Sequence, residues 1–503
     1  MAPAASNAPC HLAVDLGAGS GRAVLGRLGE RGLVLDEVHR FHYPPANEAG
    51  RLRWPFACIL EGLKGSLAAG ARAAEAGGRG IATVGVDSWG VDYGLLDAGG
   101  RLLEDPVCYR DHRTDGAMEH VFREVPRAEI FHRTGIQFLQ FNTLFQLAVH
   151  AREGLPAGAR RLLMIPDLCH HALSGSLCGE YTNASTTQLL DVRTARWADD
   201  LFSRLALPRE LMPDLATPGS FLGELRASLQ KELGLGPVRV VAPATHDTAS
   251  AVAGTPLQPG WAFVSSGTWS LVGVERGSPL VNDAVARANF TNEGGAFGTV
   301  RLLKNVMGLW ILDSCRHEWE ERGLSADLEG LLAAAAAIER PPGLVFPDHP
   351  RFFNPASMTA EVQGALAETG QGVPDDPARL ARVVLDSLAF RYASVARTVE
   401  ALTGERLLGL HIVGGGCHND YLNQATAEAL GLPVQAGPAE ATAAGNVLLQ
   451  ALASGRLASL DEGRRLVARA EGPRRFEPRE RPGWREAAER YREIEGRYAP
   501  DAV

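Results

Sequence analysis

The amino-acid sequence predicts an α/β protein in which two related domains face each other across a cleft. With 503 residues, the chain is too long to fold around a single hydrophobic core. Short apolar runs typical of strands alternate with longer amphipathic runs typical of helices, which is the pattern of α/β folds. The frame V-x-x-G-x-x-S occurs at residues 14–20 and again at residues 264–270, about half a chain later. A repeat at this distance indicates two domains of related build, which we place at residues 1–246 and 247–503.

The first copy of the frame lies in the stretch Val-Asp-Leu-Gly-Ala-Gly-Ser-Gly-Arg at residues 14–22. Apolar residues on both sides predict a strand, a tight glycine turn and a second strand. Glycines allow positive φ and let a bulky anion approach the backbone, so we expect bare N–H groups at the tip that can bind phosphate. Asp15 would lie beside a divalent cation held between it and the phosphates. The alternative is a purely structural glycine hairpin, since such hairpins are common.

Two better-known phosphate-binding motifs do not fit this stretch. The dinucleotide fingerprint G-x-G-x-x-G has to open a helix, but Arg22 occupies its last glycine position and a strand-like run follows. The P-loop requires Gly-Lys followed by Ser or Thr, and no lysine is nearby. An apolar run also follows residues 264–270, so a second glycine hairpin is expected there. Two such hairpins that face each other could clamp one polyphosphate from both sides. The repeat therefore favours nucleotide binding over a structural turn.

Polar residues cluster just beyond two buried apolar strands, where open α/β sheets place their ligands. Residues 81–86 lead into residues 87–94, and residues 238–243 lead into Thr-His-Asp-Thr, whose acid is Asp247. Trp89 fits either a surface for stacking a sugar or a place in the core. Asp247 fits either a general base aimed into the cleft or the N-cap of a helix.

Three further stretches in the second half of the chain predict local structure or ligand contact. Residues 289–295 are rich in Asn and Gly and predict a turn, and residues 302–305 predict the start of a helix that continues to residue 319. Three consecutive glycines at residues 414–416, between a strand and a helix, would permit flat contact with a planar group such as adenine.

Composition and charge exclude several classes of protein. A formal net charge of −9 argues against a nucleic acid or an anionic membrane surface as partner. The 7 cysteines are scattered without a C-x-x-C pair, which indicates reduced thiols in a cytoplasm rather than disulfides or a zinc site. No apolar run approaches the ~20 residues that span a membrane, and the first residues do not have the pattern of a signal peptide. We therefore expect a cytoplasmic protein.

Taken together, the motifs resemble those of the FGGY carbohydrate kinases, within the superfamily of actin, hexokinase and Hsp70. The resemblance extends from about residue 11 to about residue 452. Its motifs are residues 15–22, 85–93, 109–114, 135–146, 180–190, 246–252, 265–271, 292–310 and 411–418. As a set they are far more specific than any one of them. The resemblance implies two actin-like (ribonuclease H-like) domains around an active-site cleft.

The resemblance also implies roles for the residues at matching positions. ATP would be bound by Ala18, Gly19, Ser20, Gly21, Arg22, Thr268 and Gly415, with Asp15 close to Mg²⁺. The sugar would be bound by Gly90, His246, Asp247, Thr248 and Asn305, with Asp247 as the catalytic base.

One position departs from the family's pattern, and a second stretch bears on the choice of sugar. Members that act on L-rhamnulose often have Gln two residues beyond a Leu-Trp pair that here ends at Trp310, close to Asp313. Whether Asp313 replaces that Gln as a nucleotide contact stays open. Members that act on xylulose carry Gln-Met-His where this chain has Ser88-Trp89-Gly90, which argues against that substrate.

The activity that the resemblance implies is ATP-dependent phosphorylation of L-rhamnulose at O1, in L-rhamnose catabolism. A sugar hydroxyl is a weak nucleophile that needs a positioned carboxylate, and domain closure would exclude water. The alternatives are a kinase for another ketose such as L-fuculose, or a non-catalytic ATP-gated sugar-binding protein. Asp247 beside His246 favours an enzyme. We expect no macromolecular partner other than a second copy, so the protein would be a monomer or a homodimer.

Overall fold

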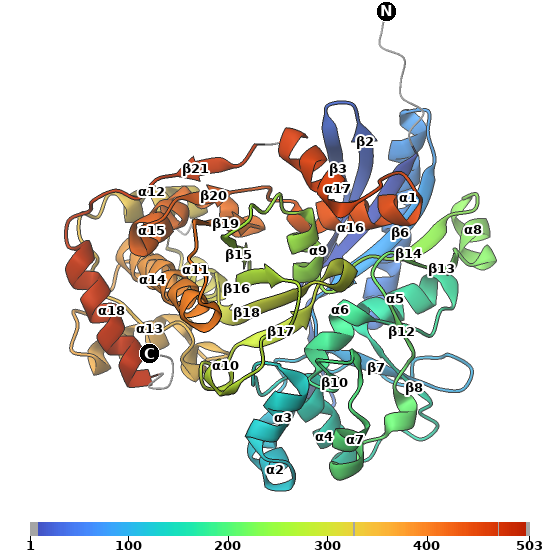
Figure 1. Ribbon diagram of the computed structural model, residues 1–503, viewed down its shortest axis with the longest axis horizontal. Helices are drawn as coiled ribbons and strands as arrows, with labels where there is room; N and C mark the ends of the chain where they lie inside the picture. Colours follow the sequence, from blue (N-terminus) through green and yellow to red (C-terminus); the bar gives the residue numbers. More distant parts are fainter. Residues whose placement is uncertain (1–8, 325–326, 471, 499–503) are drawn as a thin grey trace, which may run out of the picture.

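The computed structural model describes residues 9–324, 327–470 and 472–498, and it contains two large β-sheets (Figure 1). The strand order of the first sheet is β13-β14-β6-β1-β2-β3, and that of the second is β17-β18-β16-β15-β19-β20-β21. The first sheet lies in the part of the molecule that carries the N-terminus, and the second lies among the helices on the other side. The prediction of an α/β protein with two domains around a cleft is confirmed.

The first sheet joins an antiparallel half to a parallel half. β1 pairs antiparallel with β2, and β2 with β3, whereas β1 runs parallel to β6, and β6 to β14. The core of β1 is apolar on both faces because helices cover both sides of the sheet. The strand bounds are β1 (Cys10–Leu16), β2 (Ser20–Gly29), β3 (Gly32–His42), β6 (Ile81–Ser88), β13 (Ser220–Glu224) and β14 (Arg239–Ala242).

The second sheet repeats this arrangement. β15 pairs antiparallel with β16, and β16 with β18, whereas β15 runs parallel to β19, and β19 to β20. The two glycine hairpins, β1–β2 and β15–β16, therefore hold equivalent places in their sheets. The bounds are β15 (Trp261–Ser266), β16 (Trp269–Arg276), β17 (Thr291–Gly294), β18 (Val300–Met307), β19 (Gly409–Val413), β20 (Val434–Ala436) and β21 (Arg474–Phe476).

Two of the predicted local structures in the second half are wrong. Thr291–Gly294 is the strand β17 rather than a turn, and Asn305 lies on the strand β18 rather than on a helix. β18 pairs along its whole length with β16, so the ladder of that hairpin overrides the helical preference of its Leu and Lys residues. The helix α11 begins only at Trp310.

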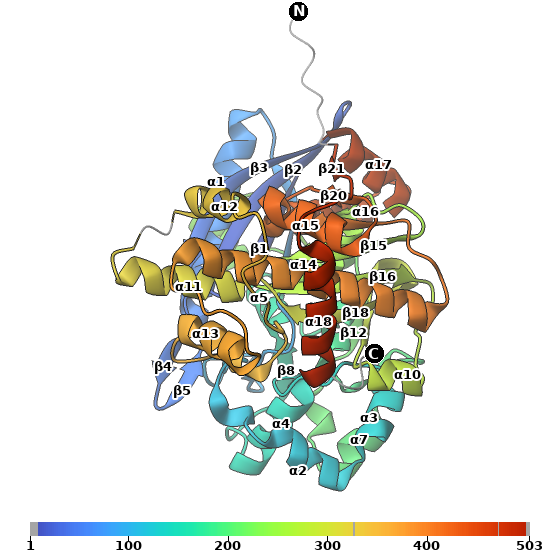
Figure 2. The same cartoon turned by 90° about the vertical axis from the view of Figure 1, so that its left-hand side faces the viewer.

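Long helices cover the second sheet (Figures 1 and 2). The longest, α14, starts with an Asp376 side chain that accepts from the Arg379 N–H and ends before Gly404, whose φ is 72°. An Asp cap at the start and a left-handed glycine at the end are the expected boundaries of a helix. The helices of this region are α11 (Trp310–Glu321), α12 (Leu328–Ala336), α13 (Met358–Glu368), α14 (Pro377–Thr403), α15 (Asp420–Leu430) and α18 (Trp484–Tyr498).

The segment between β6 and β14 forms a helical lobe, drawn in teal and green at the bottom of Figure 1. It contains the short antiparallel pair β7–β8, and its helix α5 packs against β6, β13 and β14 of the first sheet. The elements are β7 (Tyr93–Leu96), α2 (Ala117–Glu124), α3 (Arg127–Thr134), α4 (Thr143–Glu153), β8 (Arg161–Met164), α5 (Ile165–Ser174) and α7 (Asp199–Arg204).

The chain returns to the first sheet near its end. α16 (Ala441–Ala453) and α17 (Leu460–Ala470) pack against β1, β2 and β3, opposite α1 (Phe56–Ala76). Figure 1 shows these red C-terminal helices beside the blue N-terminal strands. The short helix α9 (Asp247–Gly254) packs on α16 and connects the two sheets. The boundary at residue 246 stays a prediction.

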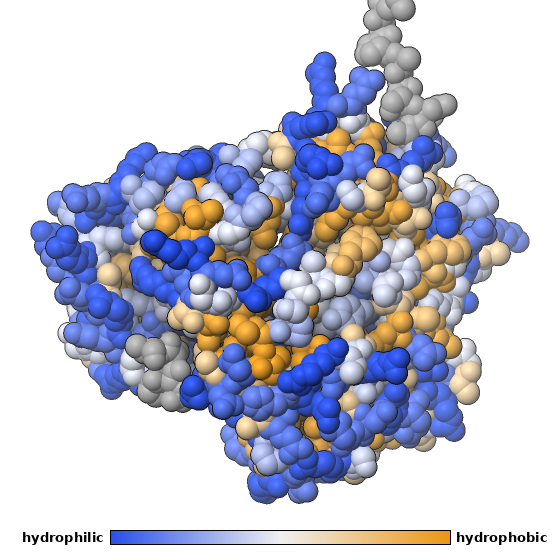
Figure 3. All heavy atoms as spheres, in the orientation of Figure 1, coloured by the Kyte–Doolittle hydropathy of each residue, from blue (hydrophilic) through white to orange (hydrophobic). Residues whose placement is uncertain are grey.

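The outer surface is mainly hydrophilic on the face drawn in Figure 3, with an apolar patch near the middle of that face. None of the helices in the described part of the chain is both long enough and apolar enough to span a bilayer.

Candidate active site

A cavity of about 290 Å³ lies between the two sheets, and the turns of both glycine hairpins line it. Further lining residues come from the ends of β1, β6 and β19, from the start of α9 and from β18. The predicted site residues in this lining are Asp15, Ala18, Arg22, Gly90, His246, Asp247, Thr248, Thr268, Asn305 and Gly415. The fold thus brings predicted site residues that lie far apart in the sequence together around one cavity.

Four predicted residues lie outside this lining: Gly19, Ser20, Gly21 and Asp313. The first three belong to the first hairpin, in which Gly19 adopts a φ of 122° that only glycine tolerates easily. Asp313 lies in the first turn of α11, with a side chain that is 48% exposed and is 3.5 Å from Arg316. Its nucleotide contact stays a prediction.

The two hairpin turns use part of their backbone internally. The Gly17 N–H donates to the Ser20 carbonyl and the Gly19 N–H to the Gly17 carbonyl, both at 2.8 Å. The expectation of bare N–H groups throughout the tip was therefore wrong for these two glycines. Among the described residues, the N–H of Ala18 has no hydrogen-bond partner, and the same holds for Thr268 at the matching position of the repeat. Each turn thus has an N–H group without a partner at a residue that lines the cavity.

Asp15 and Arg22 form an ion pair at the mouth of the first hairpin. Arg22 donates to Asp15 Oδ2 from Nη2 at 2.8 Å and from Nε at 3.1 Å, and its Nη1 donates to Glu440 at 2.8 Å. Burial alone would lower the pKa of Arg22, but the two carboxylates outweigh it and raise that pKa. Arg22 therefore stays cationic beside the cavity.

The donors present fit a Mg²⁺ ion that is held mainly by substrate. Both Arg22 contacts go to Oδ2 of Asp15, which leaves Oδ1 of the same carboxylate for a cation. No group of three or more His, Cys, Asp or Glu in the described residues could hold a metal. Mg²⁺ is commonly bound through one or two carboxylates together with waters and substrate phosphates. One carboxylate is therefore a sufficient protein contribution.

Asp87 is a second acid near Asp15 that sequence reasoning left out of the site. The two residues are direct neighbours in the parallel pair β1–β6, and Asp87 accepts from the Asn446 side chain at 2.5 Å. Burial chiefly, and then the charge of Asp15, raises the pKa of Asp87 well above its usual value. Burial beside Asp15 thus favours the neutral form of Asp87 more than exposure to water would.

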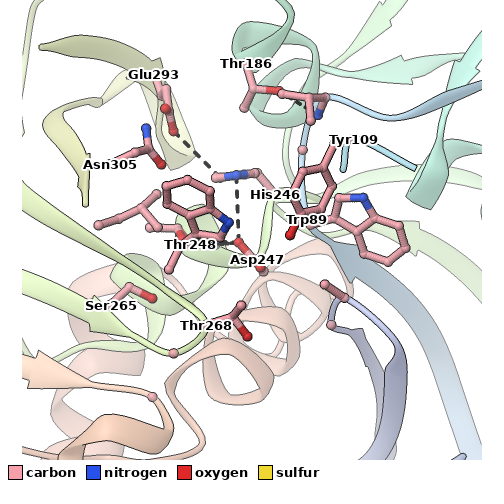
Figure 4. Close-up of a pocket in the computed structure, with 18 of the residues that line it drawn as sticks. Trp89, Tyr109, Thr186, His246, Asp247, Thr248, Ser265, Thr268, Glu293 and Asn305 are labelled. Atoms are coloured by element: carbon pink, nitrogen blue, oxygen red, sulfur yellow. Dashed lines mark hydrogen bonds and ion pairs between the residues drawn. The ribbon is translucent and has the colours of Figure 1, made fainter. Parts of the chain in front are cut away.

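Asp247 is the first residue of α9, and its carboxylate faces the cavity (Figure 4). His246 rather than Asp247 holds the cap position of α9, but Asp247 Oδ1 still accepts from the Thr248 N–H at 2.5 Å, so the carboxylate also binds one N–H group of the first helical turn. Asp247 Oδ1 accepts from the Thr248 hydroxyl at 3.1 Å. Burial chiefly, and then the charge of Asp15, raises the pKa of Asp247 to about 7. The side chain stays 35% exposed, so a hydroxyl can reach it.

His246 is held in one neutral form. Its Nδ1 accepts from Arg301 Nη1 at 3.0 Å, so we assign the proton to Nε2, which lies 3.8 Å from Asp247 Oδ1. Burial chiefly, and then the charge of Arg301, lowers the pKa of His246 well below its usual value. The imidazole thus presents an N–H donor on the side of Asp247.

An aromatic wall encloses one side of the cavity. Trp89 is only 8% exposed yet lines the cavity. The residue therefore both packs in the core and offers a surface to a ligand. Its Nε1–H donates to Asp92 at 3.0 Å, and Trp54 donates to the same carboxylate at 2.7 Å. Trp269 and Phe141 also line the cavity, with ring centroids 5.6 Å apart. The wall offers apolar contact to a ligand with an apolar end.

Two family models cover most of the chain. The N-terminal domain of the FGGY family of carbohydrate kinases matches residues 10–254, and the C-terminal domain of that family matches residues 262–454. The chain belongs to the FGGY family of carbohydrate kinases. The resemblance inferred from the motifs is confirmed, and this kinase is an enzyme that uses ATP and a sugar. Such kinases typically also use a divalent metal ion.

Curated relatives align with nearly the whole kinase. A rhamnulokinase of Bacteroides thetaiotaomicron is 40% identical over 479 residues, which are 94% of this chain and 96% of the relative. A rhamnulokinase of Pectobacterium carotovorum subsp. carotovorum is 43% identical over 473 residues, which are 93% of each chain.

Solved structures share the fold of the kinase. The gluconate kinase from Lactobacillus acidophilus superposes with a TM-score of 0.79 at 16% identity, over 98% of both chains. The Plasmodium falciparum glycerol kinase with ADP superposes with a TM-score of 0.76 at 15% identity, again over 98% of both chains. At such identities the likeness shows the two-domain fold alone.

Several lining residues of the kinase were missed by sequence reasoning, above all Glu293. It lies on β17 directly opposite Arg301 of β18, and it is 4% exposed. Because residues 289–295 were expected to form a turn, no strand and no partner for Glu293 were predicted. Its place inside the motif at residues 292–310 was the available signal. Gln137 also lines the cavity, and its Oε1 accepts from the Asn305 N–H at 2.8 Å.

Proposed function

We propose that this kinase transfers the γ-phosphoryl group of ATP to O1 of L-rhamnulose, giving L-rhamnulose 1-phosphate and ADP. The reaction would be a step of L-rhamnose catabolism. The observation that carries the proposal is identity of 40% and 43%, over more than nine-tenths of the chain, to proteins named rhamnulokinase. The motifs named above and the geometry of the cavity support it.

The phosphates of ATP would lie between the two hairpins. The free N–H groups of Ala18 and Thr268 belong to residues that line the same cavity, and they would donate to phosphate oxygens, while Arg22 would add positive charge. We assign Gly19, Ser20 and Gly21 to the shape of the first turn, and Gly415 to the adenosine. Mg²⁺ held at Asp15 would neutralise charge on the phosphates when bound, as phosphoryl transfer requires.

Asp247 would act as the base for the sugar. With a pKa of about 7, much of its carboxylate is ionised at neutral pH, and it can accept the proton of O1. O1 then forms a bond to the γ-phosphorus while the bond between that phosphorus and the bridging oxygen breaks, and ADP leaves. His246, neutral and with Nε2–H towards Asp247, would orient the sugar together with Gly90, Thr248 and Asn305.

The test of this function is a comparison of sugars in a coupled assay of ADP release. L-Rhamnulose and L-fuculose differ in hydroxyl configuration, and a site built to hydrogen-bond particular hydroxyls rejects a misplaced one. We expect kcat/KM for L-rhamnulose to exceed that for L-fuculose at least about tenfold, or ~1.4 kcal/mol in the transition state. Xylulose should be poorer still.

Equal or reversed specificity constants would contradict the assignment of L-rhamnulose. They would move the assignment to another ketose while leaving the fold and the base untouched. If no sugar stimulated ADP release while sugar and ATP together still raised the melting temperature, the protein would be a binding protein instead.

A further inference from the structure

Glu293 forms a polar corner of the cavity, on the other side of His246 from Asp247 (Figure 4). Its Oε2 is 3.8 Å from His246 Nδ1, whereas Asp247 lies at the opposite ring nitrogen. Asn305 lies beside it on the neighbouring strand. A sugar with O1 at Asp247 would meet Glu293 and Asn305 if it extended along His246.

The carboxylate of Glu293 has acceptor capacity that the protein leaves unused. Oε2 is 3.3 Å from Arg301 Nη1, yet within the described residues it accepts no hydrogen bond. Burial chiefly raises the pKa of Glu293, whereas the charge of Arg301 favours the ionised form. An ionised carboxylate has room for about four hydrogen bonds, and a buried acceptor left without them is costly.

An ion pair with Arg301 is not by itself a sufficient reason for a buried acid at position 293. Glu275 faces Arg301 from the strand on its other side, and it shows how a purely structural acid is satisfied in this sheet. Glu275 Oε2 lies 2.8 Å from Arg464, and its Oε1 accepts from the Thr299 hydroxyl at 3.1 Å. Glu275 does not line the cavity. Glu293 differs in two respects: apart from its ion pair with Arg301, its Oε2 accepts no hydrogen bond within the described residues, and the residue lines the cavity.

We infer that Glu293 accepts a hydrogen bond from a secondary hydroxyl of the sugar, on a carbon remote from O1, and thereby determines which hydroxyl configuration is accepted. This inference rests on the proposed function, because it takes L-rhamnulose as the sugar. The carboxylate contacts the substrate but not the reacting atoms. It therefore contributes to sugar binding and specificity rather than to proton transfer.

The experiment compares the wild-type kinase and the variant Glu293→Gln on L-rhamnulose and on its 3-, 4- and 5-deoxy analogues. In the wild type, removal of the hydroxyl that Glu293 accepts should lower kcat/KM at least about 100-fold, since the carboxylate then stays unpaired. In the variant, the same removal should matter less than about threefold. On L-rhamnulose the variant should raise KM at least about tenfold with little change in kcat.

Two further variants separate specificity from structure. Glu275→Gln is the matched control, because it removes an acid paired with an arginine in the same sheet but outside the cavity, and its KM and deoxy-sugar penalties should equal the wild type's. Glu293→Asp keeps the charge beside Arg301 while withdrawing the carboxylate by one methylene. It should fold even if Glu293→Gln does not, and it should show the same rise in KM.

The inference is overturned if both Glu293 variants keep the wild-type penalties for all three deoxy analogues, or if KM for L-rhamnulose is unchanged. Failure of the proposed function looks different, because the wild type itself would then prefer another ketose. The same comparison is in that case made with the deoxy analogues of the preferred sugar.

Discussion

Asp247 shows how far the surroundings of a residue alter its chemistry. In water its carboxyl has a pKa near 4, but at the floor of the cleft burial and the nearby charge of Asp15 raise the pKa to about 7. The group thereby comes close to the pH at which a general base is most effective. Neutral His246, held by Arg301, adds no positive charge that would lower the pKa again.

Replacing Asp247 with Asn tests its role as the base. We expect kcat to fall by roughly 10²- to 10⁴-fold, the usual contribution of a general base, with affinities for ATP and sugar largely intact. Calorimetry and a coupled ADP assay measure the two quantities. Wild-type turnover with unchanged affinities would contradict the role.

The melting temperature of Asp247→Asn is a control that distinguishes a lost base from a lost fold. The folded state raises the pKa of Asp247, so at pH values above its unfolded pKa the ionised carboxylate lowers the stability of the native state. Asn removes that cost. The melting temperature of Asp247→Asn at pH 8 should therefore equal or exceed that of the wild type, which rules out loss of fold as the reason for lost turnover.

The pH profile of the wild type gives an independent test. The base acts when it has lost its proton, so activity should rise with pH through about 7 and fall below it. Between pH 6 and pH 8 we expect kcat/KM to increase about tenfold. A profile that stays flat down to pH 5 would show that the group in control titrates near the ordinary value for Asp.

At the scale of elements, the two glycine hairpins are equivalent pieces of two equivalent sheets. Gly17 and Gly267 both line the cavity, and an added Cβ would meet no atom closer than 3.4 Å at Gly17 or 3.8 Å at Gly267. Neither glycine has a φ in the left-handed region. A larger residue can therefore adopt the backbone conformation of either glycine, and its side chain would fill part of the cavity.

Gly17→Val and Gly267→Val should each weaken ATP binding more than sugar binding. We expect at least about a tenfold rise in Kd for ATP in each variant, because the branched side chains enter the path of the phosphates. Calorimetry on the folded variants measures this, with sugar affinity as the internal control. Normal ATP affinity in both variants would contradict the clamp.

At the scale of the whole molecule, the C-terminal helices join the two sheets into one body. α16 contacts the first sheet through Gln450, whose amide donates to the Leu12 carbonyl at 3.0 Å and whose carbonyl accepts from Thr83 at 2.5 Å. On its other side α16 crosses α9, which carries Asp247. At this crossing a Cβ on Gly445 would lie 1.8 Å from the Ser250 carbonyl oxygen.

Gly445→Ala should therefore destabilise the protein although alanine favours helices. The clash is with the backbone of α9, at Ser250 and Gly254, so we expect a loss of about 1–3 kcal/mol, the usual cost of overpacking. Gly496→Ala is the matched control, since it lies within α18 with no atom within 4 Å of an added Cβ. That control should be neutral or stabilising by up to about 1 kcal/mol. Denaturant unfolding that ranked the two variants equally would contradict the close crossing.

The oligomeric state and the cellular location of the protein stay predictions.

The sequence by itself determined the features that depend on neighbours in the chain. The hairpins at residues 14–22 and 264–270, the strand ends that carry Gly90 and Asp247, and the two-domain α/β class follow from local glycine placement and apolar periodicity. Each of these needs only a short segment to form, so its signal is contiguous in the sequence.

Only the tertiary structure decided the rest. Glu293 lies on a strand because β17 pairs with β18, and Asn305 because β18 pairs with β16. Arg301 meets His246 although 55 residues separate them. The free N–H groups of the turns, the neutral state of His246 and the raised pKa of Asp247 likewise depend on contacts between distant segments. Propensity describes a residue's own backbone, whereas strand pairing and desolvation are set by whichever remote residues surround it.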